Sequence, residues 1–318
     1  MFEQLILGVR LLEADDLGIG VKEKAKTSHA SSAPDSPVVA SDDPRVQEIA
    51  RLAGIYGGVI LSGPPGTSKT FYASAAAEVI AGESSRVKYV QFHASYQYED
   101  FMLGFAPTAT GFKPKDGPFL TLVKAARDHP ETYVLVIDEL SRADVGRVFG
   151  EALTYVENTK RELEFTIANG DRIKVPENLV ILATMNPFDR GVDEVDAAFE
   201  RRFAKISMDP DRELLQDILD ANGMEGDLQK RVIVWFDRIN NHAARNPAAA
   251  VGHAYFSSAS DEKSLTDIWR YQLKYLVERA FRRDQNTRAA LETGWQHIFT
   301  TRDAPEPVTQ PQQAPPEG

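Results

Sequence analysis

The sequence has no cysteine among its 318 residues, which excludes disulfide bonds, thiolate metal sites and a cysteine nucleophile. Its six histidines show no metal-site spacing such as HExxH. No apolar run approaches the roughly 18 residues of a membrane span, so we expect no membrane contact. The opening MFEQLILGVRLLEADDL lacks the basic segment and cleavage site of a signal peptide, and the sequence therefore predicts a cytoplasmic protein.

Basic residues are also fewer than acidic ones. The chain has 36 Lys and Arg against 47 Asp and Glu, a net charge of −11 with histidine neutral. This balance argues against a broadly basic nucleic-acid-binding surface, although a local basic groove stays compatible with it. The length suffices for one large domain or two modest ones with a real core. Because the composition is that of an ordinary globular chain, the function must be read from local motifs.

The two ends of the chain differ in composition from the rest. Residues 1–44 combine a short predicted helix at 2–12 with a flexible linker rich in Ser, Ala and Pro. Residues 303–318 are rich in Pro and Gln and predict a disordered tail. Asp42 or Asp43 could cap a helix that has Pro44 in its first position.

Apolar runs alternate with helical patterns between residues 45 and 209. The runs GGVILSG, TYVLVIDEL and LVILATMN predict apolar, buried strands, and VKYVQFH predicts a further strand. The segments between them predict helices, with a single helix over VGRVFGEALTYVEN. This order predicts an α/β fold with a parallel sheet covered on both faces. LEFTIANGDRIKV predicts a hairpin in which Asn169 and Gly170 both take positive φ. From 210 to 302 the pattern is wholly helical.

The stretch GPPGTSKT, residues 63–70, is close to a phosphate-binding loop and lies between a predicted strand and a predicted helix. Its backbone N–H groups would surround an anion, Lys69 would reach the β and γ oxygens, and Thr70 would supply a hydroxyl to Mg²⁺. The alternative, a Pro-Gly turn before a surface helix, leaves the Lys-Thr pair without a role. The predicted nucleotide-binding residues are Gly63, Pro64, Pro65, Gly66, Thr67, Ser68, Lys69 and Thr70.

Ser68 departs from this pattern, which asks for glycine at its position. Glycine is essential only where φ is positive or where a side chain would collide with phosphate. We expect φ to be negative at Ser68, because a helix starts there and serine is favoured at helix starts. On this expectation the loop remains able to bind phosphate.

Polar residues follow two of the predicted strands. An open α/β sheet binds ligands at the carboxyl ends of its strands, so Asp138 is expected to hold Mg²⁺ and Glu139 to polarise a water for attack on the γ-phosphate. Asn186 follows another apolar run and could orient the same water. The alternatives are an acidic pair that caps the next helix and a strand-ending Asn-Pro turn.

Two adjacent arginines occur in the segment FERRF. Arg201 and Arg202 fit two interpretations, a solvated surface or an arginine finger that acts on a neighbouring subunit's nucleotide. The local sequence favours neither.

Together these elements resemble the AAA+ class of ring-forming P-loop NTPases, and more narrowly the McrB family, the GTPase motor subunits of methylcytosine-specific restriction systems. The resemblance covers roughly residues 45–300 and is carried by VQFHASYQYEDFMLGF, KDGPF, IDELSRADVGRVFGE, VPENLVILATMNPFDR, DEVDAAFERRF and GHAYF. It implies an AAA+ nucleotide-binding domain over 45–209 and a smaller all-helical lid over 210–302. It also implies assembly into a homo-oligomeric ring, a hexamer, with nucleotide at each subunit interface.

Further site residues are implied by the resemblance alone. Asn186 and Asp189 match an MNxxD signature whose members help to position the catalytic water. Arg142 and Arg202 match arginines that contact the nucleotide across the interface. His253 lies in a segment that would close over the nucleotide.

The departures from the family shape the functional expectation. Besides Ser68, the signature has Pro187-Phe188 where the family has small residues, which leaves ATP and GTP both open. The arm before Pro44 is too short for a DNA-reading domain. We therefore expect a Mg²⁺-dependent ATPase or GTPase that serves an McrC-like nuclease or another effector, with DNA contacted through partner chains. The alternative is a MoxR-like chaperone or nucleotide-gated scaffold that remodels a protein partner without DNA.

Overall fold

The structure, a computed structural model, describes residues 41–188 and 197–300. The predicted helix at 2–12, Asp189 and the predicted tail at 303–318 lie outside the described residues.

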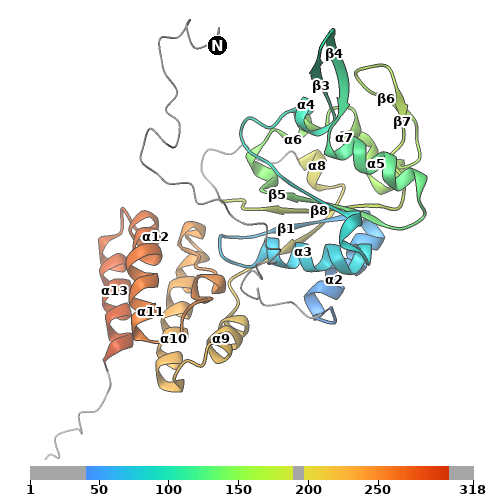
Figure 1. The fold of residues 1–318 in the computed structure, drawn as a ribbon. Coiled ribbons are helices and arrows are strands. Elements are labelled where there is room, and N and C mark those ends of the chain that lie inside the picture. The colour runs from blue at the N-terminus through green and yellow to red at the C-terminus, as the bar shows by residue number, and fades with distance from the viewer. Residues whose placement is uncertain (1–40, 189–196, 301–318) are drawn as a thin grey trace, which may run out of the picture. The chain divides into compact units, whose positions relative to one another are not determined.

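Five strands form a central sheet in the order β2-β5-β8-β1-β9, and their pairings are parallel (Figure 1). These strands are β1 (Gly58–Ser62), β2 (Val87–Gln91), β5 (Tyr133–Asp138), β8 (Leu179–Met185) and β9 (Ala204–Ser207). The three central strands β5, β8 and β1 are almost wholly buried, as their continuous apolar sequences require. The predicted α/β fold with a parallel sheet is confirmed.

Helices cover both faces of this sheet. On one face lie α2 (Pro44–Tyr56) and α3 (Lys69–Ala81), which share a core with Val59 and Leu61 of β1. On the other face lie α4 (Tyr98–Phe101), α5 (Pro118–Asp128), α6 (Val145–Phe149), α7 (Ala152–Tyr155) and α8 (Ala197–Glu200). Asp43 caps α2, because its Oδ1 accepts from the N–H of Arg45 at 2.8 Å.

Two local predictions are wrong. The single helix predicted over residues 145–158 breaks at Gly150, whose φ is 50° and where a Cβ would lie 2.7 Å from the ring of Tyr98. In the hairpin of β6 (Phe165–Thr166) and β7 (Arg172–Ile173), only Gly170 of the turn has positive φ. Asn169 instead turns the chain with its side chain, whose Oδ1 accepts from the N–H of Asp171 at 3.1 Å.

A second hairpin was not predicted from the sequence. The strands β3 (Leu103–Thr108) and β4 (Gly111–Asp116) pair in antiparallel register and stand apart from the main sheet. Each strand contains a proline, Pro107 and Pro114, and proline within an apolar run argues against a strand. The hairpin tolerates them because it has two free edges.

From Arg212 to Phe299 the chain is helical, as predicted. Its helices are α9 (Arg212–Ala221), α10 (Gly226–Ala243), α11 (Glu262–Ile268), a π-helical turn at Trp269–Leu273, α12 (Lys274–Ala280) and α13 (Gln285–Gln296). They share a core of their own around Trp235, Phe256 and Trp295. This region is the helical lid. Within the described ranges, no helix is both long and apolar enough to cross a membrane.

Candidate functional site

The phosphate loop, residues 63–70, connects β1 to α3 in the strand–loop–helix order that the motif requires. Lys69 and Thr70 are the first two residues of α3. The Nζ of Lys69 donates to the carbonyl oxygen of Pro64 at 2.7 Å, and the buried Thr67 hydroxyl donates to the same oxygen at 2.9 Å. The lysine side chain therefore runs from the start of α3 back to the carbonyl group of Pro64 in the loop.

The backbone at Ser68 contradicts the expectation for this residue. Its φ is 60° and its ψ 22°, which is the left-handed region, and it occupies the position just before the first residue of α3 without a side-chain capping bond. The motif therefore asks for glycine here because of the backbone conformation, and a serine costs about 1–2 kcal/mol more. The Oγ of Ser68 lies 3.0 Å from Nε2 of His253. This contact is specific to a residue that carries a hydroxyl.

Asp138 lies beside the phosphate loop, as predicted from its position after an apolar strand. Its Oδ1 accepts hydrogen bonds from Thr70 Oγ1 at 2.9 Å and from Thr184 Oγ1 at 2.5 Å. Hydroxyl and carboxylate oxygens are the ligands that Mg²⁺ prefers, so Thr70 and Asp138 fit a Mg²⁺ shared with phosphates. Thr184 was not predicted, although it is the single polar residue of the apolar strand β8.

Glu139 directly follows β5 and also has a left-handed backbone, with φ 57° and ψ 44°. Its N–H donates to Thr184 Oγ1 at 3.3 Å, and its carboxylate accepts from Nε of Arg142 at 3.1 Å. Such a conformation costs about 1–3 kcal/mol and clusters at functional sites. It turns the chain sharply at the carboxyl edge of the sheet, next to Asp138.

Asn186 follows β8, the strand adjacent to β5, and is buried. Its Oδ1 accepts from the N–H of Phe188 at 3.1 Å, which is the local turn contact of the alternative interpretation. Because both strands end at one edge of the sheet, Asn186 and Asp138 share that edge. The two interpretations of Asn186 are therefore compatible.

The structure separates the two adjacent arginines. Arg201 is exposed, whereas Arg202 is 8% exposed and has its Nε 3.7 Å from Glu157 Oε2. In the part of the chain that the structure describes, Nε and Nη1 of Arg202 have no hydrogen-bond partner. Only Arg201 therefore presents its side chain to solvent.

A lid segment, residues 252–256, lies directly on the phosphate loop. The N–H of Ala254 donates to the carbonyl oxygen of Gly66 at 2.9 Å, and a Cβ at Gly252 would come 2.0 Å from that oxygen. At Gly66, whose φ is 75°, a Cβ would come 2.8 Å from the ring of Tyr255. Glycine is required at both positions because the two backbones approach so closely.

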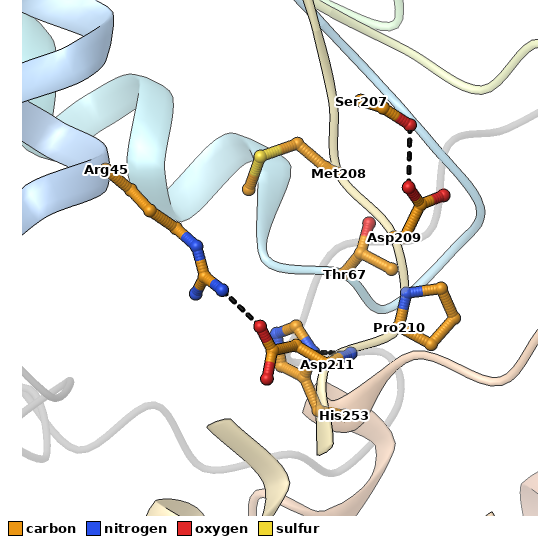
Figure 2. A pocket seen from close by; sticks show the side chains of 8 residues that line it. All are labelled: Arg45, Thr67, Ser207, Met208, Asp209, Pro210, Asp211 and His253. Carbon is orange, nitrogen blue, oxygen red and sulfur yellow. Dashed lines mark hydrogen bonds and ion pairs between the residues drawn. The ribbon is translucent and has the colours of Figure 1, made fainter. Parts of the chain in front are cut away.

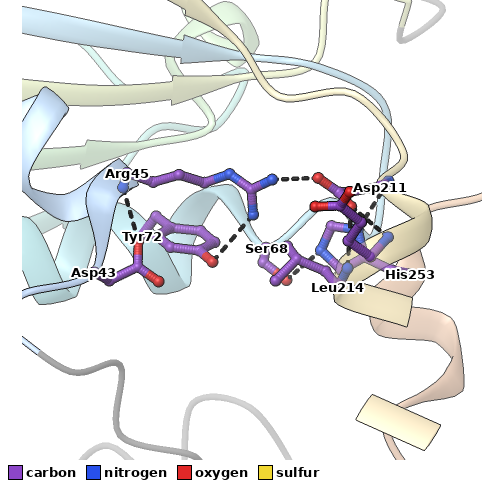
Figure 3. A network of polar contacts seen from close by, with 8 residues as sticks. Asp43, Arg45, Ser68, Tyr72, Asp211, Leu214 and His253 are labelled. Carbon is purple, nitrogen blue, oxygen red and sulfur yellow. Dashed lines mark hydrogen bonds and ion pairs between the residues drawn. The ribbon is translucent and has the colours of Figure 1, made fainter. Parts of the chain in front are cut away.

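His253 joins the loop to a polar network (Figure 3). It is buried, and its Nδ1 accepts from the N–H of Asp211 at 3.3 Å. The neutral ring therefore carries its hydrogen on Nε2, which donates to Ser68 Oγ. Asp211 also forms an ion pair with Arg45 of α2 and caps α9 by accepting from the N–H of Leu214. Burial, with the charge of Arg45, lowers the pKa of His253 to about 4 against the opposing effect of Asp211.

A pocket of about 190 Å³ opens beside this network (Figure 2). Its lining comes from α2, the phosphate loop, the end of β9 with its connection to α9, and the lid segment: Arg45, Thr67, Ser207, Met208, Asp209, Pro210, Asp211 and His253. Of these residues only Thr67 and His253 were predicted. The others carry no local motif, and they meet only through the fold.

Comparisons with known proteins bear on the family. The profile described as "AAA domain (dynein-related subfamily)" matches residues 58–203. The chain is also 33% identical over 258 residues to the Type IV methyl-directed restriction enzyme EcoKMcrB subunit of Escherichia coli (strain K12), covering 74% of this chain and 56% of that relative. The chain is an McrB-like AAA+ protein. The resemblance stated from the motifs is thereby confirmed.

A second relative of this McrB-like protein is the Type II restriction enzyme BsuMI component YdiS of Bacillus subtilis (strain 168). It is 28% identical over 188 residues, covering 46% of this chain and 55% of that relative. The chain thus spans a little over half the length of both relatives. The region matched by the family profile holds the phosphate loop, the acidic pair, Asn186 and both arginines, whereas His253 lies beyond it.

Proposed function

We propose that this McrB-like AAA+ protein is a Mg²⁺-dependent nucleoside triphosphatase that acts on ATP or GTP. The observation that carries the proposal is the hydrogen bond of 2.9 Å from Thr70 Oγ1 to Asp138 Oδ1. It joins the end of the phosphate loop to the acidic end of β5, so that a hydroxyl and a carboxylate meet where Mg²⁺ would bridge to phosphate. Bound there, Mg²⁺ would neutralise charge that develops on the phosphoryl oxygens.

The remaining side chains of the site are proposed to bind the phosphates and to position the attacking water. Lys69 would exchange the carbonyl of Pro64 for the β and γ oxygens of the nucleotide. Glu139, held by Arg142, would polarise the attacking water, and Asn186 would orient it. Asp189 is proposed to assist Asn186 on the strength of the family signature.

The pocket beside the loop is proposed to receive the base of the nucleotide. Thr67 belongs both to the loop and to the pocket, so the pocket adjoins the loop that is proposed to bind phosphate. Its volume of about 190 Å³ suits part of a nucleotide, because whole-ligand pockets measure roughly 300–1,000 Å³. The lining offers the guanidinium of Arg45 and the carboxylate of Asp209, groups that either purine could use. ATP and GTP are therefore both to be tested.

We further propose that the protein forms a homo-oligomeric ring, a hexamer, and serves as the motor of a restriction or phage-defence complex. Both relatives are named as parts of restriction enzymes, one as a subunit and one as a component. An McrC-like nuclease or another effector would complete the complex and contact DNA. A MoxR-like chaperone role is not favoured, because neither relative is of that kind. The exposed Arg201 supports a contact with the neighbouring subunit.

The test is steady-state phosphate release from ATP and from GTP, with and without Mg²⁺, by the wild type and by Glu139→Gln. We expect the variant to bind nucleotide but to lose about 10²–10⁴-fold in turnover, the usual contribution of a general base. Glu162→Gln is the matched control, because Glu162 also has a left-handed backbone (φ 62°) but lies in an exposed turn. Absence of Mg²⁺-dependent release from either nucleotide would contradict the proposal, and full turnover in Glu139→Gln would contradict the role of that residue.

A further inference from the structure

Ser68 is the one residue of the phosphate loop that departs from the glycine pattern, and its backbone gives no reason for the departure. Its φ of 60° is a conformation that glycine adopts freely and that other residues adopt only at a cost in free energy. The side chain must therefore contribute something that glycine lacks, if the serine is more than a defect.

The contribution is a hydrogen-bond acceptor for the lid. Nε2 of His253 lies 3.0 Å from Ser68 Oγ, and the other ring nitrogen, Nδ1, accepts from the N–H of Asp211. The neutral ring thus donates from Nε2, and Ser68 is its acceptor. His253 is 2% exposed, so a glycine at position 68 would leave a buried donor without this partner.

The same histidine links the loop to two more distant elements (Figure 3). Asp211 caps α9 through its Oδ1 and binds Arg45 of α2 through its Oδ2. Ser68 in turn immediately precedes Lys69 and Thr70, the residues proposed to hold phosphate and Mg²⁺. A displacement of the lid segment would therefore shift the start of α3, and a change in the loop would shift the lid segment.

We propose that Ser68 is a positioning residue of the nucleotide site, which acts through His253 to hold the lid on the phosphate loop. The inference rests on the triphosphatase function proposed above. It adds that the Ser68 side chain connects the lid to the phosphate loop, and that the serine does not mark a loop that has lost phosphate binding. It follows that Ser68→Gly, although it restores the common loop pattern and suits the backbone better, weakens the retention of nucleotide.

The experiment measures the affinity of the full chain for fluorescent ATP and GTP analogues in the presence of Mg²⁺. Ser68→Gly and His253→Asn are each expected to weaken binding about fivefold, because one neutral hydrogen bond is lost. The asparagine keeps an acceptor for the N–H of Asp211 but has no atom in place of Nε2. The double variant is expected to bind no more weakly than either single variant, since both remove the same bond.

Three readouts separate positioning from a merely structural role. Ser68→Asn, which tolerates a left-handed backbone and keeps an oxygen acceptor, is expected to recover part of the affinity. The thermal midpoint of Ser68→Gly without nucleotide is expected to be no lower than that of the wild type. Glu162→Gly, which relieves the same kind of backbone away from the lid, is expected to leave binding unchanged.

The outcomes distinguish this inference from the function on which it rests. A wild type that binds neither analogue would overturn both. A wild type that binds, with Ser68→Gly binding equally well or more tightly, would overturn the coupling and leave the triphosphatase proposal standing. So would losses that multiply in the double variant, because independent effects mean that Ser68 and His253 do not act through one bond.

Discussion

At the scale of single residues, two residues of the candidate site have backbone conformations that glycine adopts more easily. Ser68 has φ 60° and Glu139 has φ 57°. Each costs about 1–3 kcal/mol and persists only where the surroundings over-determine it. His253 contacts the first side chain and Arg142 the second. The strain lies beside the residues proposed to handle the nucleotide, so function explains it better than stability does.

The buried His253 predicts how stability depends on pH. Its pKa is about 4 in the folded protein, facing Asp211 and Arg45, against about 6.5 in an unfolded chain. Between these values the unfolded chain binds a proton that the folded chain excludes, so the free energy of unfolding falls as the pH drops from about 6.5 to about 4. Above that window the contribution of His253 is fully present.

Urea unfolding at several pH values across that window checks this prediction. The slope of the unfolding free energy against pH is expected to be shallower in His253→Asn than in the wild type, because asparagine does not titrate. Equal slopes in the two proteins would mean that other groups cause the acid sensitivity.

At the scale of secondary-structure elements, a buried arginine connects segments at the amino-terminal edge of the sheet. The candidate site lies at the opposite, carboxyl-terminal edge. Arg161 is 5% exposed and donates to the carbonyl oxygens of Gly57 at 3.0 Å, Val156 at 3.3 Å and Pro176 at 3.2 Å, and also to that of Leu179. Burial lowers its pKa to about 10, so it stays charged at neutral pH. Four carbonyl groups thus accept from one side chain, and two of them, those of Gly57 and Pro176, also accept a backbone N–H.

We expect Arg161→Met to lower the free energy of unfolding by about 3 kcal/mol, because four buried carbonyl groups each lose a hydrogen bond from a charged donor. Equilibrium urea unfolding measures the change. The matched control is Arg172→Met, in which an exposed arginine loses an ion pair of 3.7 Å with Glu164. That change should stay within about 0.5 kcal/mol. A similar loss in both variants would argue against a special role for Arg161.

At the scale of the whole molecule, the proposed ring predicts that activity depends on assembly. An arginine supplied by a neighbour is worth about 10³–10⁵ in rate. We therefore expect phosphate release per chain to rise with protein concentration and to level off once the ring is complete, as followed by turnover and light scattering on the same samples. Full activity in a preparation shown to stay monomeric would contradict the ring.

Mixing two inactive variants tests which arginine crosses the interface. Glu139→Gln lacks the carboxylate proposed to be catalytic, and Arg201→Ala lacks the group proposed to act on a neighbour's nucleotide. In a random one-to-one ring about a quarter of the sites combine both intact groups, so activity is expected to return. Arg202→Ala is the matched variant, and because its side chain is buried we expect loss of stability rather than complementation. Recovery with Arg202→Ala alone would exchange the two assignments.

Much of the fold was readable from the sequence because its signals are local. Apolar runs such as the one that became β8 predict buried strands, and the loop at residues 63–70 is recognisable from its own letters. The placement of Asp138 at the carboxyl end of β5 followed from the general rule for parallel sheets. The hairpin of β3 and β4 was not predicted because proline argues against a strand. Proline is compatible with these two strands only because each has a free edge.

By itself the sequence determined the class of fold, the strand–loop–helix motif and the family, because each depends on residues close together in the chain. Only the tertiary structure decided which distant segments meet. Ser68 and His253 are 185 positions apart, and Arg45 and Asp211 are 166 apart. It also decided that Arg201 is exposed while its neighbour Arg202 is buried. Adjacent residues of one type share their local pattern, and only the packing of other elements around them makes them differ.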